Sequence, residues 1–185
     1  MDKLLKLSDV RFKLPFNINH GLSVFVIRDL LKYPDEYIVD FDVYLPTKGK
    51  NLQRPFVWTL FQKQELIMSM LKEIKLTPMA IIQYKDEDKN DDVRIYKVID
   101  GKQRLSTILS FARGEFPIEV KGISYTINDF DDWARNAILN HWVLADVGYE
   151  YTSTPISDDN KIKWFELINF AGTPQDIEHL NNLKS

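Results

Sequence analysis

The chain has 185 residues, with 24 lysines and arginines against 27 aspartates and glutamates and a formal net charge of −3. This balance gives no overall attraction for nucleic acid, so any such contact requires a local basic surface. The lack of cysteine excludes thiol catalysis, cysteine-ligated zinc and disulfides. Because no signal peptide and no run of about 20 apolar residues is present, we expect a soluble, cytoplasmic protein without a membrane partner.

The hydrophobic content of 44% predicts a packed domain, whose elements follow from the spacing of the apolar residues. Apolar stripes at helical spacing predict helices over 22–31, 62–75, 129–144 and 158–170, with another directly after Gly101 and a last one from Thr173. Alternation and short apolar runs predict strands over 37–45, 79–84 and 93–99, and Gly122 predicts a further hairpin within 115–127.

These elements predict an α+β fold, with a small mixed sheet, flanking helices and a helical C-terminal third. We expect residues 1–127 to form the α+β domain. Residues 128–185 are then expected to form a helical extension packed on that same domain.

The strongest chemical feature is the junction Asp100-Gly101, where a predicted strand runs straight into a helix. Free backbone N–H groups and the helix dipole make such a start an anion site, which Gly101 lets a ligand approach closely. Lys102 and Arg104 add positive charge, and Gln103 could orient a water or hold a sugar hydroxyl. The alternative is that Asp100 only caps the helix while Lys102 and Arg104 are solvated.

A second feature is the segment 51–58, in which Arg54 precedes a proline and two aromatic residues. This arrangement is a rigid way to present one guanidinium group ahead of a helix. The alternative is that Pro55, Phe56 and Trp58 form a hydrophobic lid on the next helix and Arg54 is a surface charge.

Metal binding has weaker support in the sequence. Asp40 and Asp42 would share one face of the predicted strand 37–45 and could hold a divalent cation, although acidic residues on an exposed strand face are more often only solvated. The three histidines, His20, His141 and His179, lack the spacing of metal ligands.

Three stretches together resemble the N-terminal domain of GmrSD-type modification-dependent restriction enzymes. That family has a Gln-Arg-Pro-aromatic-x-Trp segment, then Asp-Gly-Gln-Gln-Arg, then a helix ending in Asn-x-x-Gly-Thr-Pro. The corresponding residues here are 53–58, 100–104 and 169–174. The resemblance implies a fold related to ParB and sulfiredoxin, and it extends from about Val24 to Leu180.

The resemblance also implies a nucleotide site. Asp100, Gly101, Gln103 and Arg104 would belong to it, and Arg54 is expected to face the same cleft as Arg104. Lysine at position 102 replaces the first glutamine of the family pattern. This departure keeps phosphate binding plausible and weakens the case for hydrolysis.

The leading expectation is therefore a nucleoside triphosphate-binding domain in a DNA-linked defence or mobile-element system, with hydrolysis left open. Gln103 and Asp100 would be the catalytic residues, the first positioning water and the second holding Mg²⁺. Gly101, Lys102, Arg104 and Arg54 would bind the nucleotide.

The alternative is a non-catalytic DNA- or protein-binding module, acting as a homo-oligomer or with a protein partner. Nuclease action by this chain ranks last, because no carboxylate cluster for two metals is evident. The HNH-type nuclease half of the restriction enzymes is also expected to be absent.

Overall fold

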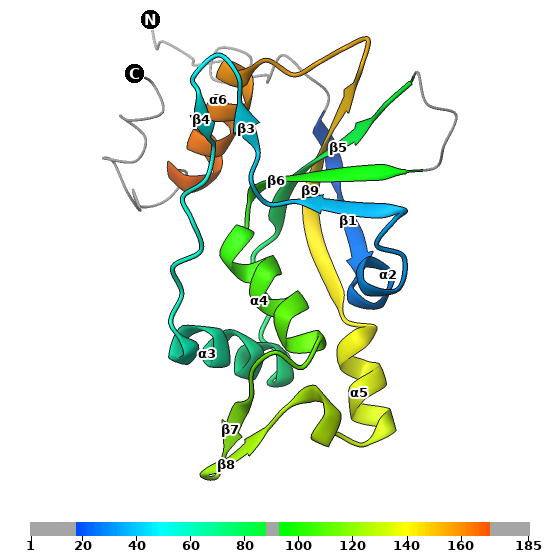
Figure 1. The fold of residues 1–185 in the computed structure, drawn as a ribbon, viewed down its shortest axis with the longest axis vertical. Helices are drawn as coiled ribbons and strands as arrows, with labels where there is room; N and C mark the ends of the chain where they lie inside the picture. The colour runs from blue at the N-terminus through cyan, green and yellow to red at the C-terminus, as the bar shows by residue number, and fades with distance from the viewer. Residues whose placement is uncertain (1–17, 88–92, 171–185) are drawn as a thin grey trace, which may run out of the picture.

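The computed structural model describes residues 18–87 and 93–170, which form a mixed sheet with helices on both faces (Figure 1). The strands are β1 Ile18–Val26, β2 Tyr37–Asp40, β3 Tyr44–Leu45, β4 Lys50–Asn51, β5 Met79–Lys85, β6 Arg94–Asp100, β7 Ile118–Val120, β8 Ile123–Tyr125 and β9 Trp142–Tyr151. The helices are α2 Ile27–Lys32, α3 Leu60–Leu71, α4 Lys102–Ala112, the 3₁₀ turn η1 Ile127–Asp129, α5 Asp132–Leu139 and α6 Asp158–Phe170. Within these ranges no helix has the length and apolar character needed to cross a membrane. The predicted α+β class is confirmed.

The main sheet has five strands in the order β1-β9-β5-β6-β2. β1 runs antiparallel to β9, and β5 runs antiparallel to β6, whereas the pairs β9–β5 and β6–β2 are parallel. Two small hairpins, β3–β4 and β7–β8, lie outside this sheet. The sheet is therefore mixed, as predicted.

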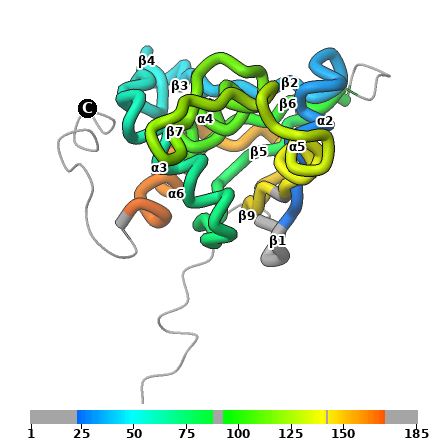
Figure 2. The backbone as a smooth tube through the Cα atoms, turned by 90° about the horizontal axis from the view of Figure 1, so that it is seen from below, coloured from blue at the N-terminus to red at the C-terminus, as the bar shows by residue number. Residues whose placement is uncertain are grey.

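Both faces of the sheet are buried, which explains the continuous apolar run at the start of β5. Met79 and Ile81 point into a core formed with α2, α3 and α4. Ala80 and Ile82 point to the other face, into a second core that contains residues of α6 and of the β3–β4 hairpin. Successive residues of a strand face opposite sides of the sheet. A strand that is covered on both sides therefore has apolar residues at consecutive positions, not at every second one. In Figure 2, α4 lies between α3 and α2 on the first face.

Strand β9 differs from the prediction, which placed a helix over 129–144. α5 ends at Leu139, and Val143, Ala145 and Val147 then alternate into the first core. Positions 138–144 are apolar enough to fit both the helical period of 3.6 residues and the strand period of 2, so the sequence pattern did not distinguish a helix from a strand there. β1 and β5 lie on either side of this segment and pair with its backbone N–H and C=O groups. This pairing stabilises the segment as a strand instead of a helix. The segment 128–185, expected to be a helical extension, thus contributes the strand β9 to the same sheet as the strands before position 127.

The helix predicted over 22–31 is also shorter than expected. Residues 18–26 form the edge strand β1, and only Ile27–Lys32 is helical. The partner that holds β1 in the sheet is β9, more than 100 positions later in the chain. A local pattern carries no information about so distant a pairing.

The strand predicted over 37–45 divides in two. β2 ends at Asp40, and the chain bends before β3 begins at Tyr44. The Asp40 carboxylate accepts a hydrogen bond from the backbone N–H of Asp42, at 2.9 Å between Oδ1 and N. Such a local bond competes with the strand ladder, and here it ends the strand.

Other predicted elements agree with the structure. β5 and β6 form the predicted hairpin, β7 and β8 form the second one around Gly122, and α6 occupies the predicted range. Thr59 is the N-cap of α3, with the reciprocal bonds of a capping box. The helix predicted from Thr173 lies outside the described residues, and the likeness to ParB and sulfiredoxin stays a prediction.

Candidate functional site

The junction between β6 and α4 is built around Gly101, which is the N-cap of α4. Its φ is 104° and its ψ is 10°, a left-handed conformation that favours glycine. A Cβ atom at this position would lie 2.8 Å from Cγ of Met79, which begins β5 in the core. Gly101 is thus required by the backbone and by close packing, whatever binds nearby.

The N-cap of α4 is Gly101, and within the described residues no side-chain hydrogen bond caps this helix start. The alternative in which Asp100 caps the helix is therefore wrong, and the Asp100 carboxylate accepts a hydrogen bond from Arg104 instead. The first N–H groups of α4 have no side-chain acceptor in the part of the chain that the structure describes, and they lie at the positive end of the helix dipole. This helix start can stabilise a negative charge that reaches it.

The Arg104 guanidinium group ties α4 to the chain ahead of β5. Its Nη1 donates to the carbonyl oxygen of Thr77 at 2.5 Å and to Thr77 Oγ1 at 2.7 Å. Its Nη2 donates to Asp100 Oδ2 at 2.8 Å and, at 3.4 Å, to the carbonyl oxygen of Pro78. Arg104 and Asp100, proposed from the sequence for phosphate and Mg²⁺, are thus bonded to each other within the fold.

The Gln103 side chain holds the Arg54 segment against α4. Its Oε1 accepts hydrogen bonds from the backbone N–H groups of Val57 and Trp58, at 3.0 and 3.3 Å. Its Nε2 donates to the carbonyl oxygen of Pro55 at 3.1 Å. Both ends of the amide are therefore engaged by the backbone of residues 55–58.

The Lys102 side chain is buried, with 8% of its surface exposed, and its ammonium group pairs with Asp42. The distance between Nζ and Asp42 Oδ1 is 2.5 Å, and the Asp42 side chain is 68% exposed. Asp42 belongs to the bend after β2, so it does not share a strand face with Asp40. Among the described residues, no group of three or more histidine, aspartate or glutamate side chains is placed to hold a metal.

Lys102 opens onto a surface groove of about 590 Å³. The groove is lined by Asp42, Asn51, Gln53, Arg54, Pro55, Phe56 and Lys102. Its volume is within the range of small-molecule and cofactor sites, roughly 300–1,000 Å³. The groove therefore brings together the two features noted in the sequence. Arg54 and its neighbours after β4 form part of its lining, and Lys102, the first residue of α4, forms another part.

Arg54 lies exposed in this groove, and no hydrogen bond or ion pair joins it to another described residue. Its neighbours fix the backbone on either side. Gln53 Nε2 donates to the carbonyl oxygen of Val98 at 2.5 Å, and the following Pro55 is held by Gln103. Within the described residues, Arg54 thus presents an unpaired guanidinium group on a segment whose backbone is held on both sides.

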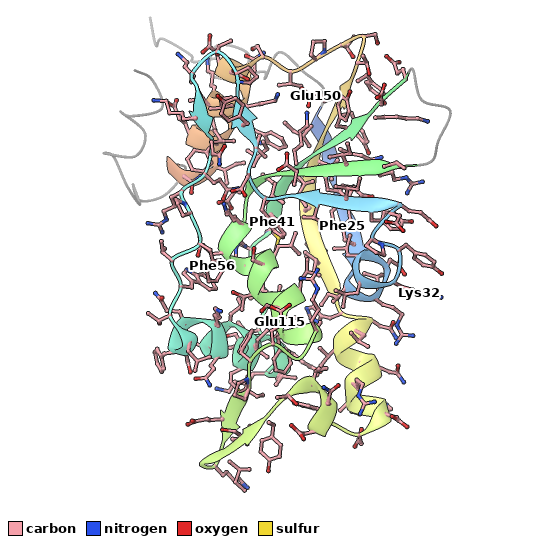
Figure 3. All side chains as sticks on the ribbon, viewed as in Figure 1. Phe25, Lys32, Phe41, Phe56, Glu115 and Glu150 are labelled. Atoms are coloured by element: carbon pink, nitrogen blue, oxygen red, sulfur yellow. The ribbon has the colours of Figure 1, made fainter. Side chains whose placement is uncertain are left out.

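An aromatic ring completes the groove. Phe56 is labelled in Figure 3 on the segment between β4 and α3, and 37% of it is exposed. The Lys63 ammonium lies 5.0 Å from the centre of its ring. The ring offers an apolar surface next to two cationic side chains, Arg54 and Lys102.

The structure therefore separates the residues predicted from the sequence. Arg54 and Lys102 line the groove, but Arg104 is not among its lining residues, and its guanidinium group is bonded to Thr77 and Asp100. The expected cleft shared by Arg54 and Arg104 is one shared by Arg54 and Lys102 instead. Asp42 was considered only as a metal ligand on a strand, and no sequence signal linked it to a lysine 60 positions later.

Comparisons with known proteins support the family suggested by these motifs. The family model described as GmrSD restriction endonuclease, N-terminal domain, matches residues 41–183, which include the whole groove and the start of α4. Comparisons with curated proteins and with solved structures found no match. The chain belongs to the GmrSD restriction endonuclease N-terminal domain family.

Proposed function

We propose that the groove between the Arg54 segment and α4 binds a nucleoside triphosphate. The observation that carries the proposal is that two cationic side chains, Arg54 and Lys102, converge on one open groove beside an uncapped helix start. Guanidinium, ammonium and free backbone N–H groups are the common ligands of phosphate in proteins. The polyphosphate would lie against Lys102 and the start of α4, with Arg54 closing over it.

Phe56 gives the site a surface for the base. Aromatic rings stack on nucleobases without selecting among them, which contributes about 1–3 kcal/mol per base in single-stranded nucleic acid complexes. Phe56 lines the same groove as Arg54 and Lys102. This placement favours a nucleotide over inorganic phosphate alone.

Asp100, Gln103 and Arg104 are assigned to positioning in this proposal. Gln103 anchors the segment that carries Arg54, and Arg104 with Asp100 anchors the start of α4. Gln103 would have to release the backbone of residues 55–58 before it could align a water. We therefore propose binding as the primary activity, with hydrolysis to be measured alongside it.

The family places the proposed site in a DNA-linked context. The matching description names a restriction endonuclease, so we propose that this domain serves a DNA-directed defence system of the cytoplasm. In such a system nucleotide binding would act as a control on the DNA-directed step.

A second function, a protein-interaction module, is favoured by a separate observation. Val57, Leu60 and Phe61 are 55%, 50% and 68% exposed and lie together at the start of α3. Exposed apolar patches of this kind often mark protein contacts. This surface could take a protein partner or a second copy of the chain, with or without a nucleotide in the groove.

A thermal-shift titration with ATP, GTP, CTP and UTP, each with and without magnesium, tests the proposal. A ligand that binds only the folded protein raises the melting temperature progressively with the logarithm of its concentration above its dissociation constant. Phosphate release measured in the same samples reports any hydrolysis. A shift for none of the four nucleotides would overturn the nucleotide site and leave the interaction module.

The matched variants are Arg54→Ala and Arg113→Ala. Arg54 is exposed and unpaired among the described residues, so its loss should weaken nucleotide binding by roughly tenfold or more without lowering the melting temperature of the free protein. Arg113 lies at the other end of α4, is 55% exposed and pairs with Glu115 on the surface, so its replacement should leave nucleotide binding unchanged and lower the melting temperature little.

A further inference from the structure

We infer that Asp42 makes this groove select phosphate that carries a magnesium ion over free phosphate, an inference that rests on the proposed nucleotide site. Asp42 and Lys102 form an ion pair with very unequal exposure, 68% against 8%. At the surface of the groove, the buried ammonium group of Lys102 is therefore already paired with the exposed carboxylate of Asp42. Any anion that reaches Lys102 must approach Asp42 as well.

The backbone that carries the Asp42 carboxylate is fixed by a hydrogen bond, and the carboxylate itself contacts Lys102. The N–H of Asp42 donates to Asp40 Oδ1 at 2.9 Å, which fixes the bend after β2. Oδ1 of Asp42 contacts the Lys102 ammonium, whereas Oδ2 makes no hydrogen bond to another described residue. One carboxylate oxygen is thus committed to the protein and the other is available to a ligand.

The charges in the groove then decide which ligand is preferred. Asp42 neutralises Lys102, so a free polyphosphate meets one net positive side chain, Arg54, and a carboxylate that repels it. Mg²⁺ bound to the phosphates reverses that repulsion. Mg²⁺ is usually held by one or two carboxylates together with the phosphates of a substrate, and Asp42 can supply one.

Asp100, the Mg²⁺ ligand suggested by the sequence, is less well placed for this role. Its Oδ2 is 2.8 Å from Arg104 Nη2, and it is not among the residues that line the groove. Among the described residues that line that groove, Asp42 is the only acidic one. The geometry thus assigns to Asp42 the contact with Mg²⁺ that the sequence had suggested for Asp100.

The test measures calorimetric binding of inorganic tripolyphosphate to the full chain, in excess magnesium and in excess chelator. For the wild type, magnesium should strengthen binding. In Asp42→Asn the amide oxygen can still accept from Lys102, so the fold is retained and the repulsion is lost. Affinity for magnesium-free tripolyphosphate should then rise by about fivefold, the ratio given by 1 kcal/mol, and magnesium should no longer strengthen binding.

Two further variants separate charge from structure. Asp35→Asn makes the same chemical change at an exposed position ahead of β2, outside the groove, and should bind as the wild type does. Asp42→Glu keeps the carboxylate and should keep the magnesium preference. If Asp42→Asn has the same magnesium dependence as the wild type, the inference is overturned while the proposed function stands. If neither tripolyphosphate nor any nucleotide binds to the wild type, both are overturned.

Discussion

Gln103 and Pro55 lie 48 positions apart and are joined by a hydrogen bond of 3.1 Å between Gln103 Nε2 and the Pro55 carbonyl oxygen. The same amide accepts the N–H groups of Val57 and Trp58. The residue that the sequence suggested for aligning water thus fixes the segment that carries Arg54. The groove therefore depends on hydrogen bonds between the segment 53–58 and the start of α4, the two segments that supply Arg54 and Lys102.

Replacing Gln103 with alanine should release that segment. Three hydrogen bonds to exposed or partly buried backbone groups are lost, each contributing about 0.5–1.5 kcal/mol to stability. We expect a loss of about 2 kcal/mol in the free energy of unfolding, because water partly replaces these bonds. We also expect faster hydrogen exchange at the N–H groups of Val57 and Trp58, measured by NMR. Unchanged exchange at both amides would contradict the anchoring role.

Arg104→Ala should be strongly destabilising, with Arg113→Ala as its matched control. The Arg104 guanidinium bonds Thr77 and Asp100 and is 17% exposed, so its loss leaves a half-buried carboxylate without its partner. We expect a loss of about 2–3 kcal/mol in urea denaturation. Arg113 pairs with Glu115 at 3.8 Å on the surface, and its replacement should cost less than about 1 kcal/mol. Equal losses would show that the Arg104 bonds contribute little.

Gly101→Ala should be more damaging than Gly49→Ala. Both glycines have positive φ, 104° and 66°, so alanine is strained by about 1–2 kcal/mol at either position. At Gly101 the new methyl group would also lie 2.8 Å from Met79 Cγ, whereas at Gly49 nothing lies within 4 Å. Overpacking typically adds about 1–3 kcal/mol. Thermal unfolding of the two variants measures the difference, and equal melting temperatures would contradict the close packing at Gly101.

Glu150 should make the stability of the protein depend on pH. It is 3% exposed, and its carboxylate contacts Lys97 at 2.5 Å and Lys161 at 3.0 Å. Burial opposes its ionisation, but the two lysines together hold the pKa of Glu150 below its usual value of 4.5. The folded state therefore binds this proton less readily than the unfolded state. The resulting stabilisation is present above about pH 4.5 and is lost as the pH falls through the lowered pKa.

Glu150→Gln tests this prediction by urea denaturation across pH 7 to 3. Near neutral pH the variant leaves two buried or half-buried lysines without a counter-charge, which should cost about 3–5 kcal/mol. Below the lowered pKa the wild-type carboxyl is also neutral, so the difference in unfolding free energy should shrink. Glu119→Gln, an exposed change on β7, should have little effect throughout. A difference for Glu150→Gln that stays constant down to pH 3 would exclude the proposed linkage.

Local features of the sequence were sufficient where one segment determines its own conformation. Thr59 and Gln62 form the capping box of α3, and Gly101 has the positive φ that a strand-to-helix turn requires. The apolar runs of β5 and β6 predict their hairpin because the two strands are close in sequence. These elements follow from bonds made within a few residues or across one turn.

The sequence alone did not determine pairings between distant segments. β9 is a strand because β1 and β5 lie on either side of it, and its own residues also fit a helix. Asp42 and Lys102 form an ion pair across 60 positions, and Arg104 bonds Thr77 across 27, and no local pattern encodes either contact. The family resemblance suggested one site for Arg54 and the start of α4. The tertiary contacts determine that Lys102 lines the groove with Arg54 and that Arg104 is bonded to Thr77 and Asp100. The physical reason is that a charged side chain takes whichever partner the fold brings within hydrogen-bonding distance.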